Sequence, residues 1–287
     1  MHSLKHLRFN FSLFLLPVFL FALSESGQQD WLNTFLIFFV LHILVYPASN
    51  GYNSYMDKDT GSIGGLRHPP KTNKLLFYVT IFMDVAALLI AYFIHIEVFV
   101  LLILYILASK AYSYRKIRLK KDPFIGYLIV FVFQGAVVFL ISHIAITQTS
   151  LFLSWESLVL PMLISSLLVG AGYPLTQIYQ HKQDIDDNVV TISFVLGIKG
   201  TFIFSGIMLL GATLLFYFYF MGNHQFNYFL LYLILTLPTT IYFIIWFNKV
   251  RSSRLAANYT NTMKMNKIST VFLNLFFLFL VAHKIIL

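Results

Sequence analysis

The chain has 287 residues, of which 59% are hydrophobic and only 11% are charged, and its mean hydropathy is +0.78. An average soluble domain is about 25% charged, so this composition excludes a soluble globular protein and indicates an integral membrane protein. Cysteine is absent, which excludes disulfides and thiolate metal sites.

Nine apolar segments are long enough to cross a membrane as helices, which takes about 20 apolar residues each. In chain order they cover residues 9–24, 31–48, 75–95, 97–113, 124–146, 151–175, 200–220, 226–247 and 268–286. The first follows Lys5 and Arg8, as the apolar part of a signal peptide would, but the sequence ALSES is a poor cleavage site, so we assign a membrane helix. The expected fold is all-α, with nine transmembrane helices in a single domain over residues 1–287.

The basic residues collect on one side of these segments. Placing the N-terminus and the even-numbered connections on that side gathers every Lys and Arg except Lys284. By the positive-inside rule this side is cytoplasmic, so we expect a cytoplasmic N-terminus and an external C-terminus. The net charge of +9 is then mainly a topology signal, and we expect contact with membrane lipid and no nucleic-acid partner.

Two connections on the predicted cytoplasmic side are long, polar and rich in oxygen ligands. They are residues 49–74, with Asn53, Asp57 and Asp59, and residues 176–199, with Gln180, Asp184, Asp186, Asp187 and Asn188. Asn53 and Asp57 are four residues apart, as are Gln180 and Asp184, so each pair would share a helix face. Such ligands suit Mg²⁺ held together with substrate phosphates, and no cluster has the spacing of a zinc site. The alternative is that polar loops carry Asp and Asn for solvation and turns, although two such loops on one face favour a shared site.

Three polar stretches follow the second, fourth and sixth predicted helices: NSYMDKDTGSI, YSYRKIRLKKDPFIG and QHKQDIDDNVVTISFVLG. They resemble the first acidic motif, the Tyr-containing Arg-Leu-Lys loop and the second acidic motif of the UbiA superfamily of intramembrane prenyltransferases. Asn53 and Asp57 match the Asn and the second acidic position of the first motif, and Asp184 and Thr191 match the second Asp and the Thr of the other. The resemblance covers most of the chain and implies nine helices around a central cavity.

The resemblance implies transfer of an isoprenoid chain from a polyprenyl diphosphate, with Mg²⁺ assistance, to an aromatic or other lipophilic acceptor. A quinone-ring precursor, as in quinone biosynthesis, a porphyrin and a lipid all stay open as acceptors. The implied catalytic residues are Asn53, Asp57 and Asp184, and the implied metal ligands are Asn53, Asp57, Asp59, Gln180, Asp184 and Asp187. The implied diphosphate-binding residues are Arg67, Tyr112, Lys116, Arg118 and Lys120. From the distribution of basic residues we expect the site on the cytoplasmic side of the membrane, which we expect to be the bacterial inner (cytoplasmic) membrane. We interpret the Gly64–Gly65 pair as a close backbone approach to phosphate.

The two acidic stretches also depart from the family pattern. The departures are Ser54 and Gly61 in place of carboxylates, Gln180 in place of an Asp and Asn188 in place of a Gly. Carboxylates at shifted positions are Asp59, Asp186 and Asp187. The alternative to an active enzyme is therefore a catalytically degenerate relative that binds an isoprenoid lipid or a partner without transfer.

Asp84 interrupts the third apolar segment, and a carboxylate in a membrane span usually faces the protein interior. It is either a functional residue or a protonated structural hydrogen-bond donor, and it is the one feature that suggests a transporter. His68 and His181 lie in the two polar loops and could contact the diphosphate or the acceptor, with packing as the alternative.

Overall fold

The computed structural model describes residues 2–27 and 29–286, which form helices and their connections without a strand. Within these ranges, nine helices are long and apolar enough to cross a membrane, so the predicted all-α membrane fold is confirmed. The single-domain range 1–287 includes Met1, Gln28 and Leu287, which lie outside the described residues, and it stays a prediction.

The first two spans are each assembled from several helical pieces. The first contains η1 (His2–Leu7), α1 (Phe9–Ser12), η2 (Leu13–Leu15) and α2 (Leu16–Ser24), and the second contains α3 (Trp31–Phe39), the π-helical η3 (Val40–Val45) and α4 (Tyr46–Asp57). Asp30 caps the second span because its carboxylate accepts a 3.0 Å hydrogen bond from the Asn33 amide. Lys58 ends the span in a left-handed conformation, with φ 55°, which leaves Asp57 as its last helical residue.

The middle spans are separated by capped turns. Their elements are α5 (Lys74–Ile94), α6 (Ile96–Ser113), η4 (Leu119–Lys121), α7 (Pro123–Ile129), the π-helical η5 (Val130–Val137), α8 (Val138–Thr147) and α9 (Leu151–Gln177). Asn73 caps α5, and Asp122 caps α7 by accepting from the amides of Phe124 and Ile125, with Pro123 as the first helical residue.

The last elements are α10 (His181–Asp186), α11 (Ile192–Gly222), α12 (Phe226–Ser252), η6 (Arg254–Ala256) and α13 (Tyr259–Ile286). Two of them begin earlier than predicted. α11 begins at Ile192 instead of residue 200 and bends at Gly197, whose φ of 66° suits glycine. α13 begins at Tyr259 instead of residue 268, because its first turns are too polar for a hydropathy criterion yet still helical.

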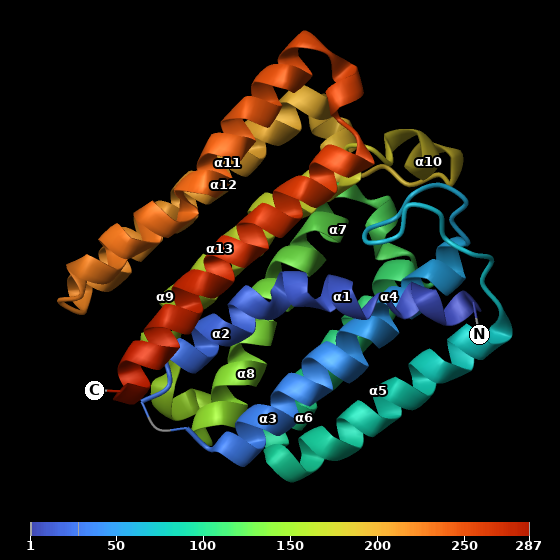
Figure 1. Cartoon of the computed structure of the whole chain (residues 1–287). Coiled ribbons are helices and arrows are strands. Elements are labelled where there is room, and N and C mark those ends of the chain that lie inside the picture. The colour runs from blue at the N-terminus through green and yellow to red at the C-terminus, as the bar shows by residue number, and fades with distance from the viewer. Residues whose placement is uncertain (1, 28, 287) are drawn as a thin grey trace.

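The helices form one bundle, and the two chain ends lie at opposite ends of it (Figure 1). The N-terminus, α10 and the connection after α4 lie at one end, which we call the loop end, and the C-terminus lies at the other. α11 packs against α9 and α12, and α13 packs against α12 and α2. The α11–α12 hairpin thus forms one flank, with α13 between it and the N-terminal helices (Figure 1).

Aromatic side chains fill the interior and also cover the outside. Phe21, Phe139 and Phe216 are fully buried in the main core cluster, where the Phe21 and Phe216 ring centroids are 5.5 Å apart. Phe93 is 84% exposed on the outer surface of α5. Large exposed apolar residues on a helix exterior are expected where the surrounding medium is lipid instead of water.

Candidate active site

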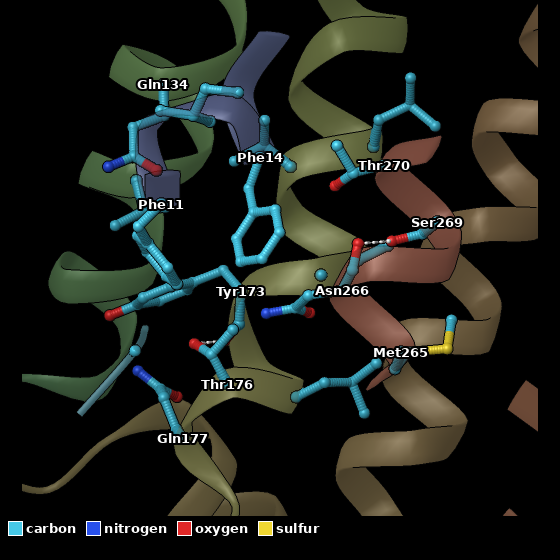
Figure 2. A pocket seen from close by; sticks show the side chains of 18 of the residues that line it. Phe11, Phe14, Gln134, Tyr173, Thr176, Gln177, Met265, Asn266, Ser269 and Thr270 are labelled. Atoms are coloured by element: carbon cyan, nitrogen blue, oxygen red, sulfur yellow. Dashed lines mark hydrogen bonds between the residues drawn. The ribbon is translucent and has the colours of Figure 1, made fainter. Parts of the chain in front are cut away.

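A cavity of about 840 Å³ runs from the loop end into the helix bundle, a volume in the range of ligand pockets. Its apolar and aromatic lining includes Phe11, Phe14, Phe133 and Tyr173 (Figure 2). The charged residues among its described lining are Arg8, Asp57, Asp59, Lys120, Asp184 and Asp187. The predicted central cavity is therefore present, with carboxylates from both acidic loops on its wall.

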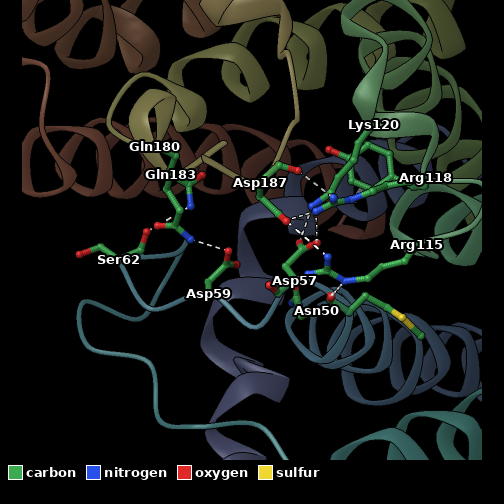
Figure 3. A network of polar contacts seen from close by, with 12 residues as sticks. Asn50, Asp57, Asp59, Ser62, Arg115, Arg118, Lys120, Gln180, Gln183 and Asp187 are labelled. Atoms are coloured by element: carbon green, nitrogen blue, oxygen red, sulfur yellow. Dashed lines mark hydrogen bonds and ion pairs between the residues drawn. The ribbon is translucent and has the colours of Figure 1, made fainter. Parts of the chain in front are cut away.

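Asp57 is held between two cations of the loop that follows α6 (Figure 3). One carboxylate oxygen lies 3.3 Å from Arg118, and the other forms an ion pair with Lys120. Arg118 also pairs with Asp187 of the second acidic loop, so one guanidinium joins the two acidic stretches. Arg115 reinforces this junction by donating to the main-chain oxygens of Met56 (2.6 Å) and Asp57 (3.1 Å).

Two left-handed residues bring these loops together. Arg118 has φ 48° and Asn188 has φ 55°, a conformation that costs a non-glycine residue about 1 kcal/mol and is kept only where surrounding contacts hold it. The Arg118 amide donates to the Tyr114 oxygen at 2.7 Å, which turns the chain back toward the acidic residues. The Arg118 side chain then donates to the Asp187 main-chain oxygen at 3.0 Å.

A second set of contacts joins the two acidic loops directly. Gln183 donates to the Asp59 carboxylate, and Gln180 donates to the Ser62 main-chain oxygen at 3.1 Å (Figure 3). A side chain at position 61 would collide with the Gln183 carboxamide, so Gly61 leaves the space that this contact needs. Burial, together with the neighbouring Asp57, raises the pKa of Asp59.

Asp184 differs from the other carboxylates because no described residue hydrogen-bonds to its side chain, although it lines the cavity. Burial raises the pKa of Asp184 to about 7; Lys120 opposes this shift, and the nearby carboxylates add to it. Asp187 behaves oppositely: burial favours its protonated form, but the hydrogen bond and charge of Arg118 hold its pKa below the usual range.

These oxygens suit a hard cation. The carboxylate of Asp184 and the amide of Asn53 line the cavity without a described partner, and so does the buried hydroxyl of Ser54. Within the described residues, no group of three or more His, Cys, Asp or Glu is already assembled as a metal site, since Asp57 and Asp187 are paired with cations. The donor set therefore fits Mg²⁺, provided that an anionic ligand draws the cations away from the carboxylates.

Tyr112 of α6 and Tyr173 of α9 lie on the cavity wall next to the charged cluster. Their hydroxyl oxygens are 2.5 Å apart. Both line the cavity, as predicted for Tyr112. The pair gives the cavity a hydrogen-bonding group between the charged loop end and the apolar interior.

Four predicted residues lie apart from the cavity lining. Arg67, His68 and Lys116 are exposed, and the His181 ring lies 2.8 Å from the Ser193 hydroxyl. The Phe11 ring packs against both Gly64 and Gly65, and Gly64 lines the cavity, so the close backbone approach to phosphate stays a prediction.

Asp84 forms an ion pair with Lys110 of α6 at 2.5 Å, and neither residue lines the cavity. The Lys110 ammonium group also lies 4.1 Å from the centre of the Tyr52 ring. Orientation arguments count Lys110 with the connection after the fourth segment, but it lies inside α6. The partner of Asp84 was therefore missed.

Three further residues at the site have roles that motif spacing does not reveal. Arg8 donates to the main-chain oxygens of Gly64 (2.8 Å) and Asn50 (3.2 Å), so it holds the first acidic loop against the first span. Arg115 and Gln183 complete the loop junction. In the sequence Arg8 and Arg115 look like any basic residue at a helix end.

A family model for the UbiA prenyltransferase family matches residues 13–268. A UbiA homolog from Archaeoglobus fulgidus, bound to DMAPP and Mg²⁺, has a TM-score of 0.69 at 13% identity, covering 98% of this chain and 99% of that chain. A UbiA homolog from Aeropyrum pernix K1 has a TM-score of 0.68 at 16% identity, covering 96% and 98%. A structure of digeranylgeranylglyceryl phosphate synthase has a TM-score of 0.63 at 20% identity and full coverage of both chains. No curated protein matches the chain, and at these identities the structural likeness concerns the fold.

Proposed function

Because the chain belongs to the UbiA prenyltransferase family, we propose that it is an intramembrane enzyme that transfers the isoprenoid chain of a polyprenyl diphosphate to a lipophilic acceptor. The observation that carries this proposal is the charged cluster at the mouth of the cavity. Carboxylates and cations for a metal-bound diphosphate lie at the loop end, and a largely apolar interior follows. This division matches the two halves of a prenyl diphosphate.

Lys120 and Arg118 are the residues that would bind the diphosphate. Each is paired with a carboxylate in this structure, and an incoming diphosphate offers more negative charge than those carboxylates do. Transfer of the two cations to the ligand frees Asp57, which with Asp184 and Asn53 would hold Mg²⁺. When bound, the metal neutralises the diphosphate and makes it a better leaving group.

The reaction exchanges a carbon–oxygen bond for a bond to the acceptor. The allylic carbon–oxygen bond breaks and its electron pair leaves with the diphosphate. The acceptor atom supplies the electron pair for the new bond and releases its proton to the departing diphosphate. Lys120 and Arg118 stabilise the charge that develops on the leaving group, and the tyrosine and phenylalanine faces of the cavity stabilise the allylic cation.

A second function has one observation in its favour. Asp57 and Asp187 are saturated by cations, and Ser54 and Gly61 replace carboxylates of the family pattern. A relative that binds an isoprenoid lipid or a partner without a metal would keep carboxylates whose charge is already compensated in this way.

Binding of geranyl S-thiolodiphosphate, a donor analogue that is not cleaved, separates the two functions. An enzyme binds it only with Mg²⁺, and Asp57→Asn or Asp184→Asn abolishes the binding. Binding that is independent of Mg²⁺ and unchanged in both variants would contradict the enzyme proposal and favour the degenerate relative.

We also propose that the loop end faces the cytoplasm of a bacterial inner membrane, as the distribution of basic residues predicts. The chain has no cysteine, so a single cysteine reports its own position. Cysteine at Lys71 should resist a membrane-impermeant maleimide in spheroplasts, and cysteine at Asn223 should react with it. The reverse labelling pattern would show that the loop end faces the outside of the membrane.

A further inference from the structure

The cavity wall contributed by α12 and α13 is polar but carries no charge. Besides Tyr232, whose hydroxyl contacts that of Thr213 at 3.3 Å, it has six polar residues: Thr236, Thr239 and Thr240 of α12 and Asn266, Ser269 and Thr270 of α13. In Figure 2 the α13 residues face the cavity opposite Gln134, and the Phe14 ring lies between them. All charged side chains of the described lining belong instead to the cluster around Asp57 and to Arg8.

Half of these polar groups are satisfied by their own helix. The hydroxyls of Thr236, Thr240 and Ser269 donate to main-chain oxygens three or four residues earlier, at 2.7, 3.4 and 3.0 Å. Such hydrogen bonds are the usual way for Ser and Thr to fit into membrane helices. These three residues therefore need no ligand to explain them.

The other half have no described partner. Thr239 is 8% exposed and Thr270 is 9% exposed, and neither hydroxyl forms a hydrogen bond with a described residue. The Asn266 amide is likewise without a partner and points into the cavity near Thr176 and Tyr173 (Figure 2). Burial of a hydroxyl without a hydrogen bond costs about 1–3 kcal/mol, which favours a role in binding for Thr239 and Thr270.

Thr239 and Asn266 lie at similar depths, and Thr270 lies about one helical turn deeper than Asn266. The Tyr242 hydroxyl contacts the Asn261 side-chain oxygen at 3.3 Å, which fixes the register of α12 against α13. Thr239 is one turn deeper than Tyr242, and Asn266 is little more than one turn deeper than Asn261. Asn266 is about 10 Å along α13 from Tyr259, at a helical rise of 1.5 Å per residue, so it follows the charged loop end directly.

The cations near this wall are already committed. All three guanidinium nitrogens of Arg8 donate to main-chain oxygens, and Lys120 and Arg118 face the carboxylates. An anionic group buried at the wall would have no counter-charge, and burial of an unpaired carboxylate is strongly unfavourable. The wall therefore suits a neutral ligand with hydroxyl or carbonyl groups.

We propose that Asn266, Thr270 and Thr239, the neutral wall, form the acceptor subsite, and that the acceptor is uncharged and carries hydroxyl or carbonyl groups. This inference rests on the proposed transferase function. A prenyl chain has no polar atoms and needs only the apolar lining. The neutral wall thus lets the cavity hold a polar but uncharged second substrate beside the allylic carbon.

Methyl 4-hydroxybenzoate and 4-hydroxybenzoate are matched probes, because they share the ring and the phenol and differ in charge. With geranyl diphosphate and Mg²⁺, kcat/KM for the ester should exceed that for the acid at least tenfold. Thr239→Val and Thr270→Val, which keep side-chain shape, and Asn266→Leu should each, as single variants, raise the KM for the ester about tenfold, the effect of one lost hydrogen bond. The KM for geranyl diphosphate should stay within twofold.

Thr236→Val and Thr240→Val are the matched controls, since these hydroxyls also line the cavity but bond to their own helix. Both should leave both KM values within twofold. Equal or better use of the acid, or wall variants that raise the donor KM as much as the ester KM, would overturn the inference.

The probes also distinguish failure of the subsite from failure of the enzyme. If wild type binds geranyl S-thiolodiphosphate with Mg²⁺ but neither binds nor prenylates the ester, the neutral wall is not an acceptor subsite and the transferase proposal stands. Loss of Mg²⁺-dependent donor binding as well would remove both.

Discussion

Buried charge occurs in two regions of this protein, and the regions differ in how the charge is compensated. In the loop-end cluster, several carboxylates face a cavity, and Asp184 has no described partner. Between α5 and α6, Asp84 has one cation, Lys110, and the pair is closed off by the Tyr52 ring away from the cavity. The loop-end cluster therefore has a carboxylate that a ligand could still bind, whereas the charges of Asp84 and Lys110 compensate each other.

This difference teaches that burial alone does not identify a functional carboxylate. A charged residue within a membrane span is by default a functional hypothesis, and Asp84 satisfies that criterion as well as any residue here. The surroundings decide otherwise, because Lys110 compensates the charge of Asp84 and neither residue lines the cavity. The transporter interpretation of Asp84 loses its basis for the same reason.

The largest expected effect is on catalysis, from changes to the carboxylates of the loop-end cluster. Asp57→Asn and Asp184→Asn should each reduce prenyl transfer by about 10³-fold or more, equivalent to about 4 kcal/mol of transition-state stabilisation. Steady-state transfer from geranyl diphosphate measures this. Asp186→Asn is the matched control, because Asp186 lies in the same motif but is exposed and outside the main cavity, and it should stay within twofold. Equal losses in all three variants would mean that Asp57 and Asp184 contribute no more to catalysis than an exposed carboxylate of the same motif.

Changes to the Asp84–Lys110 pair should lower the stability of the protein and leave prenyl transfer unaffected. Asp84→Asn or Lys110→Met alone leaves one buried charge without its partner, which should cost about 3 kcal/mol and lower the thermal midpoint in detergent. Asp84→Leu/Lys110→Met removes both charges and should recover most of that loss. A double variant that folds but no longer transfers the prenyl group would overturn the structural role of the pair.

The fold was largely predictable because spanning length and hydropathy are properties of continuous segments. The prediction was wrong at the starts of α11 and α13. α13 begins with polar turns that include Asn266, and a hydropathy criterion assigns such turns to the connection. Asn266 of these polar turns lines the cavity, so the error in the helix boundary also hid one residue of the cavity wall.

The site was predictable only where its residues share a local spacing. Asn53 and Asp57 are spaced four residues apart, and the structure brings them to one cavity wall. The partners of the carboxylates are not spaced in this way: Arg118 meets Asp57, and Lys110 meets Asp84, across separate helices and loops. Such pairs depend on tertiary packing, which sequence spacing does not encode.

Removal of a cation from the loop-end cluster should reduce catalysis less than removal of one of its carboxylates. Lys120→Met removes one of two cations that face the diphosphate site and should reduce kcat/KM about 30-fold, or about 2 kcal/mol, the strength of a charge-assisted hydrogen bond. Lys116→Met is the control, since Lys116 lies in the same loop but is exposed, and it should stay within twofold. An equal effect in both variants would indicate a general attraction between the basic loop and the donor.

Glu25, in the connection after α2, is a third case between the loop-end cluster and the Asp84–Lys110 pair. It is largely buried, a cation compensates its charge only in part, and it lies outside the cavity lining. The Tyr219 hydroxyl donates to its carboxylate, but the Lys284 ammonium is 3.9 Å away. Burial raises the pKa of Glu25 from 4.5 to about 7, against the pull of Lys284. The protonated form is therefore favoured in the folded state.

The sign of the expected pH effect follows directly. The stability that protonated Glu25 contributes is complete below its unfolded pKa and is lost as the pH rises toward 7, at which the folded group ionises. Glu25→Gln keeps a neutral side chain at every pH, so between pH 5 and pH 8 wild type should lose about 2.5 kcal/mol more stability than the variant. Thermal midpoints at the two pH values measure this difference. A steeper loss in the variant would mean that Lys284 compensates Glu25 as fully as Lys110 compensates Asp84.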